Sequence, residues 1–155
     1  MTQQRLTHGF GYGIGATILM SLFMLVATVT GASPMPEPIP KAVVATLFGS
    51  GLPKPVLLVL VVGLHLGYGG FFGAVLARVT QPVTIWKGLG LGVVLWAVMQ
   101  LTFLPFLGWG VFGIAITPKI AVATLVLHVV YGGLLGWALD RDAVIQTRES
   151  PTAAD

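Results

Sequence analysis

Apolar residues form long, nearly uninterrupted stretches in this chain, and charged residues are confined to the segments around them. Four stretches, residues 10–30, 55–77, 88–107 and 119–139, are long enough to cross a bilayer core of about 30 Å. They show no strand-like alternation, and backbone polar groups in lipid must pair within the segment, so we expect helices. The pattern therefore predicts an all-α protein with four transmembrane helices.

The connections between these stretches differ in length and composition. Residues 31–40 are too rich in proline for a helix, whereas residues 41–49 form a short apolar segment that cannot span. This segment is typical of an interfacial or re-entrant half-helix after the first span. The first stretch is longer than the hydrophobic region of a signal peptide, so we expect it to be retained.

A ten-residue motif occurs twice, as L-H-x-x-Y-G-G-x-x-G at residues 64–73 and again at residues 127–136. Residues 40–47 likewise resemble residues 118–125, and Gly11, Gly13 and Gly15 match the glycines at 88, 90 and 92. Such self-similarity indicates duplicated units. We expect one membrane domain, residues 1–140, made of two tandem helical hairpins (1–78 and 79–140) related by an axis along the membrane normal.

The polar residues that flank the spans predict an orientation. Five basic residues lie on the side of the N-terminus and three on the other side, which favours both termini in the cytoplasm: Arg5, Arg78, Lys87, Arg141 and Arg148 against Lys41, Lys54 and Lys119. Residues 141–155 are polar and contain Pro151, which predicts a disordered tail.

The composition narrows the class of protein. Of 155 residues, 55% are hydrophobic and only 8% charged, against about 25% charged in soluble domains. The net charge of +3 comes without a basic patch and interleaved aromatics, so nucleic-acid binding has no support. The absence of cysteine excludes disulfides, thiolate metal sites, iron–sulfur clusters and cysteine nucleophiles.

Each copy of the motif places a histidine, His65 or His128, in the middle of a span. An ionisable group at that depth is costly, so it needs a partner or a function. Glycines four and eight residues after each histidine lie on its helix face and allow close approach of another backbone. We therefore expect both imidazoles to face the bundle interior at similar depth.

Other polar residues of the spans lie near these histidines on the helix surface. Together they form the candidate intramembrane polar site: His65, Tyr68, Gln100, Thr124, His128 and Tyr131. Three interpretations remain open, namely structural hydrogen bonding between helices, a proton or solute pathway, and bis-histidine ligation of haem b in a four-helix bundle. Another metal site is not expected, because no carboxylate lies at that depth.

Eight glycines of the spans, including those that follow the two histidines, are predicted to pack helices together. The predicted packing glycines are Gly69, Gly73, Gly132, Gly136, Gly11, Gly15, Gly88 and Gly92. They do not form a dinucleotide-binding fingerprint, because no strand precedes them.

Catalytic chemistry finds no support in the sequence. All acidic residues lie outside the spans, and no serine lies in a nucleophile-elbow motif. We therefore expect a protein that is not an enzyme.

Three segments carry a resemblance to a known family. A-T-x-x-M-S-L-x-M-L at residues 16–25, L-P-F-L-G-W-G-V-F-G at residues 104–113 and the His128-x-x-Tyr131-Gly132 segment are similar to small four-helix prokaryotic integral membrane proteins of unknown function. The resemblance covers residues 9–139. It implies the four-span layout and supplies no activity, substrate or site residue.

These observations together predict a non-enzymatic accessory or structural component of a prokaryotic plasma membrane. Its partners are the lipid bilayer and either further copies of the chain or a larger membrane complex. The alternatives are a small transporter or proton-conducting protein that uses His65 and His128, and a haem b electron carrier; no other cofactor is expected.

Overall fold

The computed structural model describes residues 2–49 and 51–149, and within them every regular element is helical. The elements are α1 (Thr2–Val29), α2 (Ile39–Phe48), α3 (Lys54–Val79), α4 (Ile85–Val98), a π-helical turn (Met99–Phe103), α5 (Leu104–Phe106), a short 3-10 turn (Val111–Gly113) and α6 (Lys119–Glu149). The all-α prediction is confirmed for these residues.

Four of the helices are long and apolar enough to cross a membrane, as the sequence predicts. They cover Gln3–Val29, Lys54–Val79, Ile85–Phe106 and Lys119–Asp142. Large apolar side chains point outward from them; Phe23, Leu58 and Val59, for example, are between 58% and 70% exposed. A bundle that exposes so much apolar surface has the composition of a protein surrounded by lipid.

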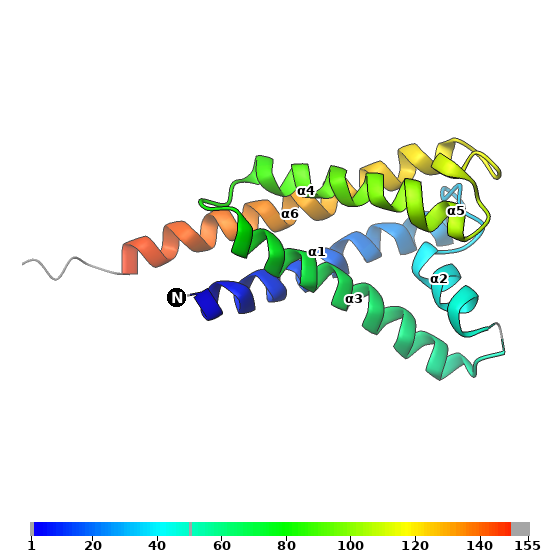
Figure 1. Ribbon diagram of the computed structural model, residues 1–155, viewed down its shortest axis with the longest axis horizontal. Helices are drawn as coiled ribbons and strands as arrows, with labels where there is room; N and C mark the ends of the chain where they lie inside the picture. Colours follow the sequence, from blue (N-terminus) through cyan, green and yellow to red (C-terminus); the bar gives the residue numbers. More distant parts are fainter. Residues whose placement is uncertain (1, 50, 150–155) are drawn as a thin grey trace, which may run out of the picture.

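The long helices pack as two pairs, α1 with α3 and α4 with α6, and α1 also packs against α6 (Figure 1). Glycines make both crossings close. A Cβ added to Gly13 would collide with the carbonyl oxygen of Gly69, and one added to Gly88 would collide with that of Gly132. The same kind of backbone contact therefore joins the helices of each pair.

Two of the predicted packing glycines do not pack within the chain. A Cβ added to Gly11 or Gly15 would meet no atom within 4 Å, so this part of the prediction is wrong for the single chain. Gly9 and Gly13 make the contacts of α1 instead, because they lie on the face toward α3. Gly69, Gly73, Gly88, Gly92, Gly132 and Gly136 all lie in tight crossings, as predicted.

The bundle is closed at one end and splayed at the other (Figure 1). α3 diverges from the other long helices toward its N-terminal end, and the short helix α2 lies in the resulting wedge and packs on α3. α2 begins after Pro38 and ends at Gly49, whose φ of 88° suits glycine. The predicted short helix is thus present, and it lies at the splayed end.

A proline explains why α4 widens near its end. Pro105 has no N–H, and in a regular α-helix its ring would crowd the carbonyl of Leu101. The turn Met99–Phe103 is π-helical, and the N–H of Leu104 reaches the carbonyl of Met99 five residues back. The extra residue in this turn relieves the crowding and carries the helix on to Phe106.

The C-terminal segment differs from its prediction. α6 continues past Asp140 to Glu149, so residues 141–149 are helical and not a disordered tail; residues 150–155 lie outside the described residues. The guanidinium carbon of Arg141 lies 4.6 Å from the ring centroid of Trp137, and Asp142 bonds to α1. These contacts hold the first residues beyond Asp140 in the helix.

Candidate functional site

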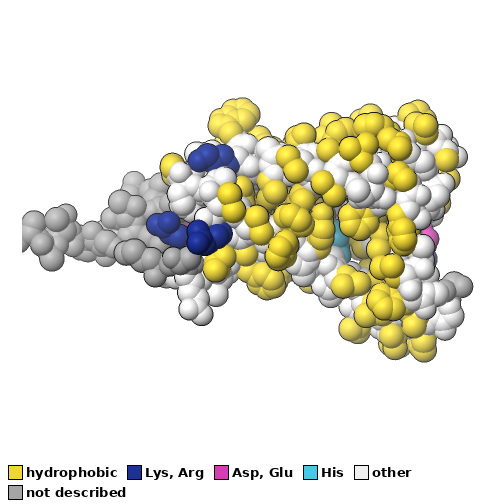
Figure 2. Space-filling view, viewed as in Figure 1, with side chains coloured by type: hydrophobic (Ala, Val, Ile, Leu, Met, Phe, Trp, Pro, Cys, Tyr) yellow, Lys and Arg dark blue, Asp and Glu magenta, His cyan; other side chains and the backbone are white. Residues whose placement is uncertain are grey.

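The wedge between the helices contains a cavity of about 320 Å³. Its walls come from α1, α2, α3, α4 with its π-helical turn, and α6, so every long helix contributes. Figure 2 shows a hollow between two apolar masses near the middle of this face, with a histidine side chain inside it. The volume is at the low end of the range for ligand pockets.

The cavity brings together most of the predicted polar site. Five of its six residues line the wall: His65 and Tyr68 from α3, and Thr124, His128 and Tyr131 from α6. The sixth, Gln100, lies behind the wall and bonds to Thr124. None of the residues that line the cavity is Asp, Glu, Lys or Arg, so the site carries no fixed charge.

The hydrogen bond of His128 fixes which ring nitrogen carries its proton. Nδ1 lies 2.8 Å from the carbonyl oxygen of Thr124, one turn earlier on α6. A carbonyl only accepts, so Nδ1–H donates and Nε2 of the neutral ring carries a lone pair. Among the described residues no group bonds to this Nε2, which leaves it available to a ligand.

His65 has the less satisfied imidazole. Its Nε2 is buried and has no hydrogen-bond partner among the described residues. A buried polar atom without a partner carries a desolvation penalty, and such atoms are few in native structures. The His65 side chain is also one of those that line the cavity.

A second polar cluster stiffens the wall behind His128. Gln100 is fully buried, and its Nε2 donates to Thr124 Oγ1 at 2.8 Å, while this hydroxyl donates to the Ile120 carbonyl at 2.7 Å. Trp96 Nε1 donates to the Ala121 carbonyl at 2.9 Å. These bonds hold α4 against α6 and fix the backbone that orients His128.

The two tyrosines of the repeated motif have different environments. The hydroxyl of Tyr131 is buried and donates to the Gly69 carbonyl at 2.7 Å, which ties α6 to α3. Tyr68 is 36% exposed, and its ring lies 4.7 Å from that of Phe72 and 6.3 Å from that of Phe103. Tyr68 therefore bridges α3 and the π-helical turn at the rim of the cavity.

Sequence reasoning missed the methionines of the site. The cavity wall includes Met20, Met24, Met35 and Met99, which come from α1, the linker after it and the end of α4. Single methionines in apolar segments give no signal in a sequence. Only the packing of the helices brings the four methionines together around one cavity.

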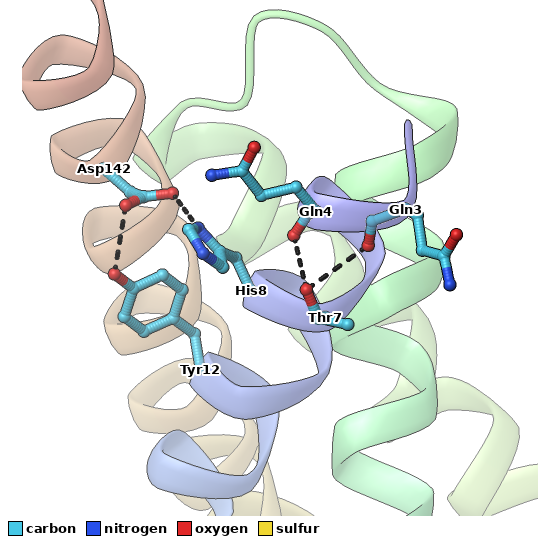
Figure 3. Close-up of polar contacts among 6 residues, drawn as sticks. All are labelled: Gln3, Gln4, Thr7, His8, Tyr12 and Asp142. Atoms are coloured by element: carbon cyan, nitrogen blue, oxygen red, sulfur yellow. Dashed lines mark hydrogen bonds and ion pairs between the residues drawn. The ribbon is translucent and has the colours of Figure 1, made fainter. Parts of the chain in front are cut away.

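Sequence reasoning also missed a polar cluster between α1 and α6, near the closed end of the bundle, which Figure 3 shows. His8 Nδ1 lies 2.8 Å from Asp142 Oδ2, and the Tyr12 hydroxyl donates to Asp142 Oδ1 at 3.3 Å. His8 and Tyr12 are four residues apart on α1, which is a sequence signal for a shared face. Their partner, Asp142, lies 134 residues from His8 and 130 from Tyr12, so no local pattern could have identified it.

The described residues contain no group of three or more His, Cys, Asp or Glu side chains that could hold a metal ion. Methionine thioethers lie outside that set of ligands.

The fold and the site together define a helical protein with four helices long and apolar enough to span a membrane and a cavity between them that is lined by two histidines. A family of unknown function, DUF6789, matches residues 3–150, and the chain belongs to this family. No curated protein and no solved structure matches the chain.

Proposed function

We propose that the protein is a non-enzymatic accessory or structural component of a prokaryotic plasma membrane that binds a small ligand in the cavity between its helices. One observation carries the binding proposal. His65 and His128 line the same cavity, and each keeps a ring nitrogen that no described group satisfies. Polar atoms at that depth are costly unless a ligand or partner compensates them.

The location in a membrane is supported by the outward face of the bundle. The four apolar helices, of 22 to 27 residues, expose their large apolar side chains over most of their length. The non-enzymatic role is supported by the chemistry of the cavity, which contains no carboxylate, lysine or arginine. Of the kinds of side chain that line the cavity, only imidazole ordinarily titrates near neutral pH, so His65 and His128 are the groups that could act as general acids or bases.

Proton conduction is the rival interpretation of the same histidines. A conducting path needs polar groups or water continuously from one side to the other. The wedge narrows toward the glycine crossings, where Gly13 and Gly69 bring two backbones into contact. Binding in a cavity that is closed at one end explains the geometry better than passage through it.

The binding proposal is tested on protein purified in a mild detergent, by absorption spectrum and intact mass under native conditions. We expect a bound species that is lost in the double variant His65→Gln/His128→Gln and kept in the control His8→Gln, which changes a histidine near the closed end. A species present equally in all three proteins, or in none, contradicts the proposal. A Soret band that depends on His65 and His128 would support the haem alternative instead.

In liposomes, the wild-type protein is expected to show no proton flux above that of protein-free vesicles. Flux that disappears in the double variant would instead support the conduction interpretation.

We also propose that the two helix pairs are tandem repeats of one hairpin, related by an axis along the membrane normal. The supporting observation is that Gly13 on Gly69 and Gly88 on Gly132 make equivalent backbone contacts. By these contacts Gly13 of the first pair corresponds to Gly88 of the second. The glycine spacing in the sequence instead pairs Gly11 with Gly88, so the two alignments differ by two residues.

We further propose that the chain works as a homo-oligomer or within a larger membrane complex. The cavity that the described residues form between the helices is small, which favours a role shared with other subunits. The mass of the detergent-solubilised particle, measured by light scattering, tests this; a mass of one chain contradicts it.

A further inference from the structure

The cavity gathers the thioethers of the chain around its two imidazoles. The four methionines at positions 20, 24, 35 and 99 all line it, and they are the only methionines among the described residues. Methionine fills irregular gaps in many protein cores, so the presence of four methionines in the wall does not by itself indicate a ligand site. What matters is the height of each sulfur-bearing side chain relative to the histidines.

Met20 lies at the height of His65. Thr17 abuts Gly69, since a Cβ added to Gly69 would collide with the Thr17 side chain. Met20 is three residues after Thr17, and His65 is four residues before Gly69 on the antiparallel helix α3. With a rise of about 1.5 Å per residue, the two Cα atoms differ by roughly 1.5 Å in height.

The side chains of Met99 and His128 lean toward each other along the bundle. A Cβ added to Gly92 would collide with the His128 carbonyl, and Met99 follows Gly92 by seven residues, about 10 Å along α4. Helical side chains lean toward the N-terminus of their own helix. Because α4 and α6 are antiparallel, the Met99 side chain leans toward His128 and the imidazole leans toward Met99.

The remaining two thioethers lie toward the splayed end. Met24 is one turn beyond Met20 on α1, and Met35 lies in the linker that leads to α2. They extend the row of thioethers from the histidines toward the end of the molecule where α2 lies.

This donor set selects one kind of ion. Thioether sulfur is a soft ligand, imidazole nitrogen is a borderline one, and both are neutral, so a set that contains several thioethers favours Cu(I). Without a carboxylate or thiolate nearby, the ligands cannot balance the charge of a divalent ion. The cost of burying an ion rises with the square of its charge, so an apolar cavity of neutral donors favours a monovalent cation.

We propose that the cavity binds one Cu(I) ion through His65 and His128 together with the thioethers of Met20 and Met99, with Met24 and Met35 lining its approach from the α2 end. The hydrogen bond from His128 Nδ1 to the Thr124 carbonyl has the form that orients metal-binding histidines elsewhere, with the outer nitrogen held and the inner one available. The inference rests on the proposed binding function and names its ligand.

The proposal is tested by anaerobic titration of the detergent-purified wild-type protein with Cu(I) in competition with a chromophoric Cu(I) chelator. We expect one Cu(I) per chain, with nitrogen and sulfur neighbours in the X-ray absorption spectrum of the complex. Absence of Cu(I) uptake against the chelator, or a spectrum without sulfur neighbours, overturns the proposal.

The decisive variants keep the shape of the cavity. Met20→Leu/Met99→Leu conserves volume and is expected to preserve the thermal unfolding temperature within a few degrees while weakening Cu(I) binding at least about tenfold. His65→Gln/His128→Gln is expected to abolish binding, and His8→Gln to leave it unchanged. A methionine variant that folds and binds Cu(I) as tightly as the wild type overturns the thioether assignment.

The two proposals fail in different ways. A copurifying species other than copper that depends on His65 and His128, together with no Cu(I) uptake, overturns the copper site and keeps the binding function. No dependent species and no uptake overturn both.

Discussion

At the scale of single residues, the glycines divide into two functional groups that the sequence does not distinguish. Gly88 and Gly90 lie on the same helix two residues apart, yet a Cβ on Gly88 would collide with the backbone of α6 and one on Gly90 would meet open space. Position on the helix face, and not residue type, decides which glycine holds two helices together.

This contrast gives a matched pair of substitutions. Gly88→Ala is expected to destabilise the protein by about 1–3 kcal/mol, because the obstructing atoms are backbone and the helices must separate. Gly90→Ala is expected to be neutral or to stabilise by up to about 1 kcal/mol through helix propensity. Thermal unfolding in detergent measures both, and equal effects would contradict the close crossing of α4 and α6.

The two tyrosines of the repeated motif provide a second pair. Tyr131→Phe removes the hydroxyl that donates to the Gly69 carbonyl and is expected to cost about 0.6 kcal/mol, the average for such bonds between membrane helices. Tyr68→Phe removes a hydroxyl for which no hydrogen bond is found among the described residues, so its unfolding temperature should match the wild type. A larger effect at Tyr68 than at Tyr131 would be inconsistent with these environments.

At the scale of helices, the sequence predicts the spans well and their ends poorly. The apolar stretch at 119–139 correctly indicates a helix, but α6 runs ten residues further, to Glu149, and His8 and Tyr12 bond to Asp142 in the first turn of this extension. Similarly, Pro105 lies within a predicted span, and its π-helical accommodation cannot be deduced from apolar periodicity. Helix ends depend on long-range partners, which a local pattern does not contain.

The contact between α1 and α6 can be weakened specifically. Asp142→Ala is expected to reduce stability by less than about 1 kcal/mol, since His8 is 36% exposed and solvent screens the pair. Backbone hydrogen exchange in the last turns of α6 should accelerate as well. Asp140→Ala, which changes an exposed acid in the same turn, is the control; equal acceleration in both variants would show that the link to α1 is unimportant.

At the scale of the whole molecule, the sequence identifies the histidine pair but not the space around it. The repeat places His65 and His128 at equivalent positions, and five of the six predicted polar residues do share one cavity. The cavity itself arises from the divergence of α3 and from α2 in the wedge. Such shapes depend on how four helices cross, so the methionines of the wall could not be assigned to the site from sequence.

The proposed orientation can be tested because the chain contains no cysteine. Gln3→Cys places a single thiol at the exposed start of α1, and Gly51→Cys places one in the exposed turn before α3. With both termini in the cytoplasm, a membrane-impermeant maleimide added to intact spheroplasts should label Gly51→Cys and not Gln3→Cys. The opposite labelling pattern would reverse the orientation, and permeabilised cells should label both.

The glycine contact between α1 and α3 also provides a pivot about which α3 can tilt. Its pivot at Gly69 divides the helix unequally, with fifteen residues or about 22 Å to Lys54 and ten residues or about 15 Å to Val79. A tilt of about 10° at the pivot displaces the Lys54 end by roughly 4 Å. The cavity lies on the long arm, so a tilt of α3 that accommodates a bound group would be largest at the turn before α3, at the opposite end of the bundle from the start of α1.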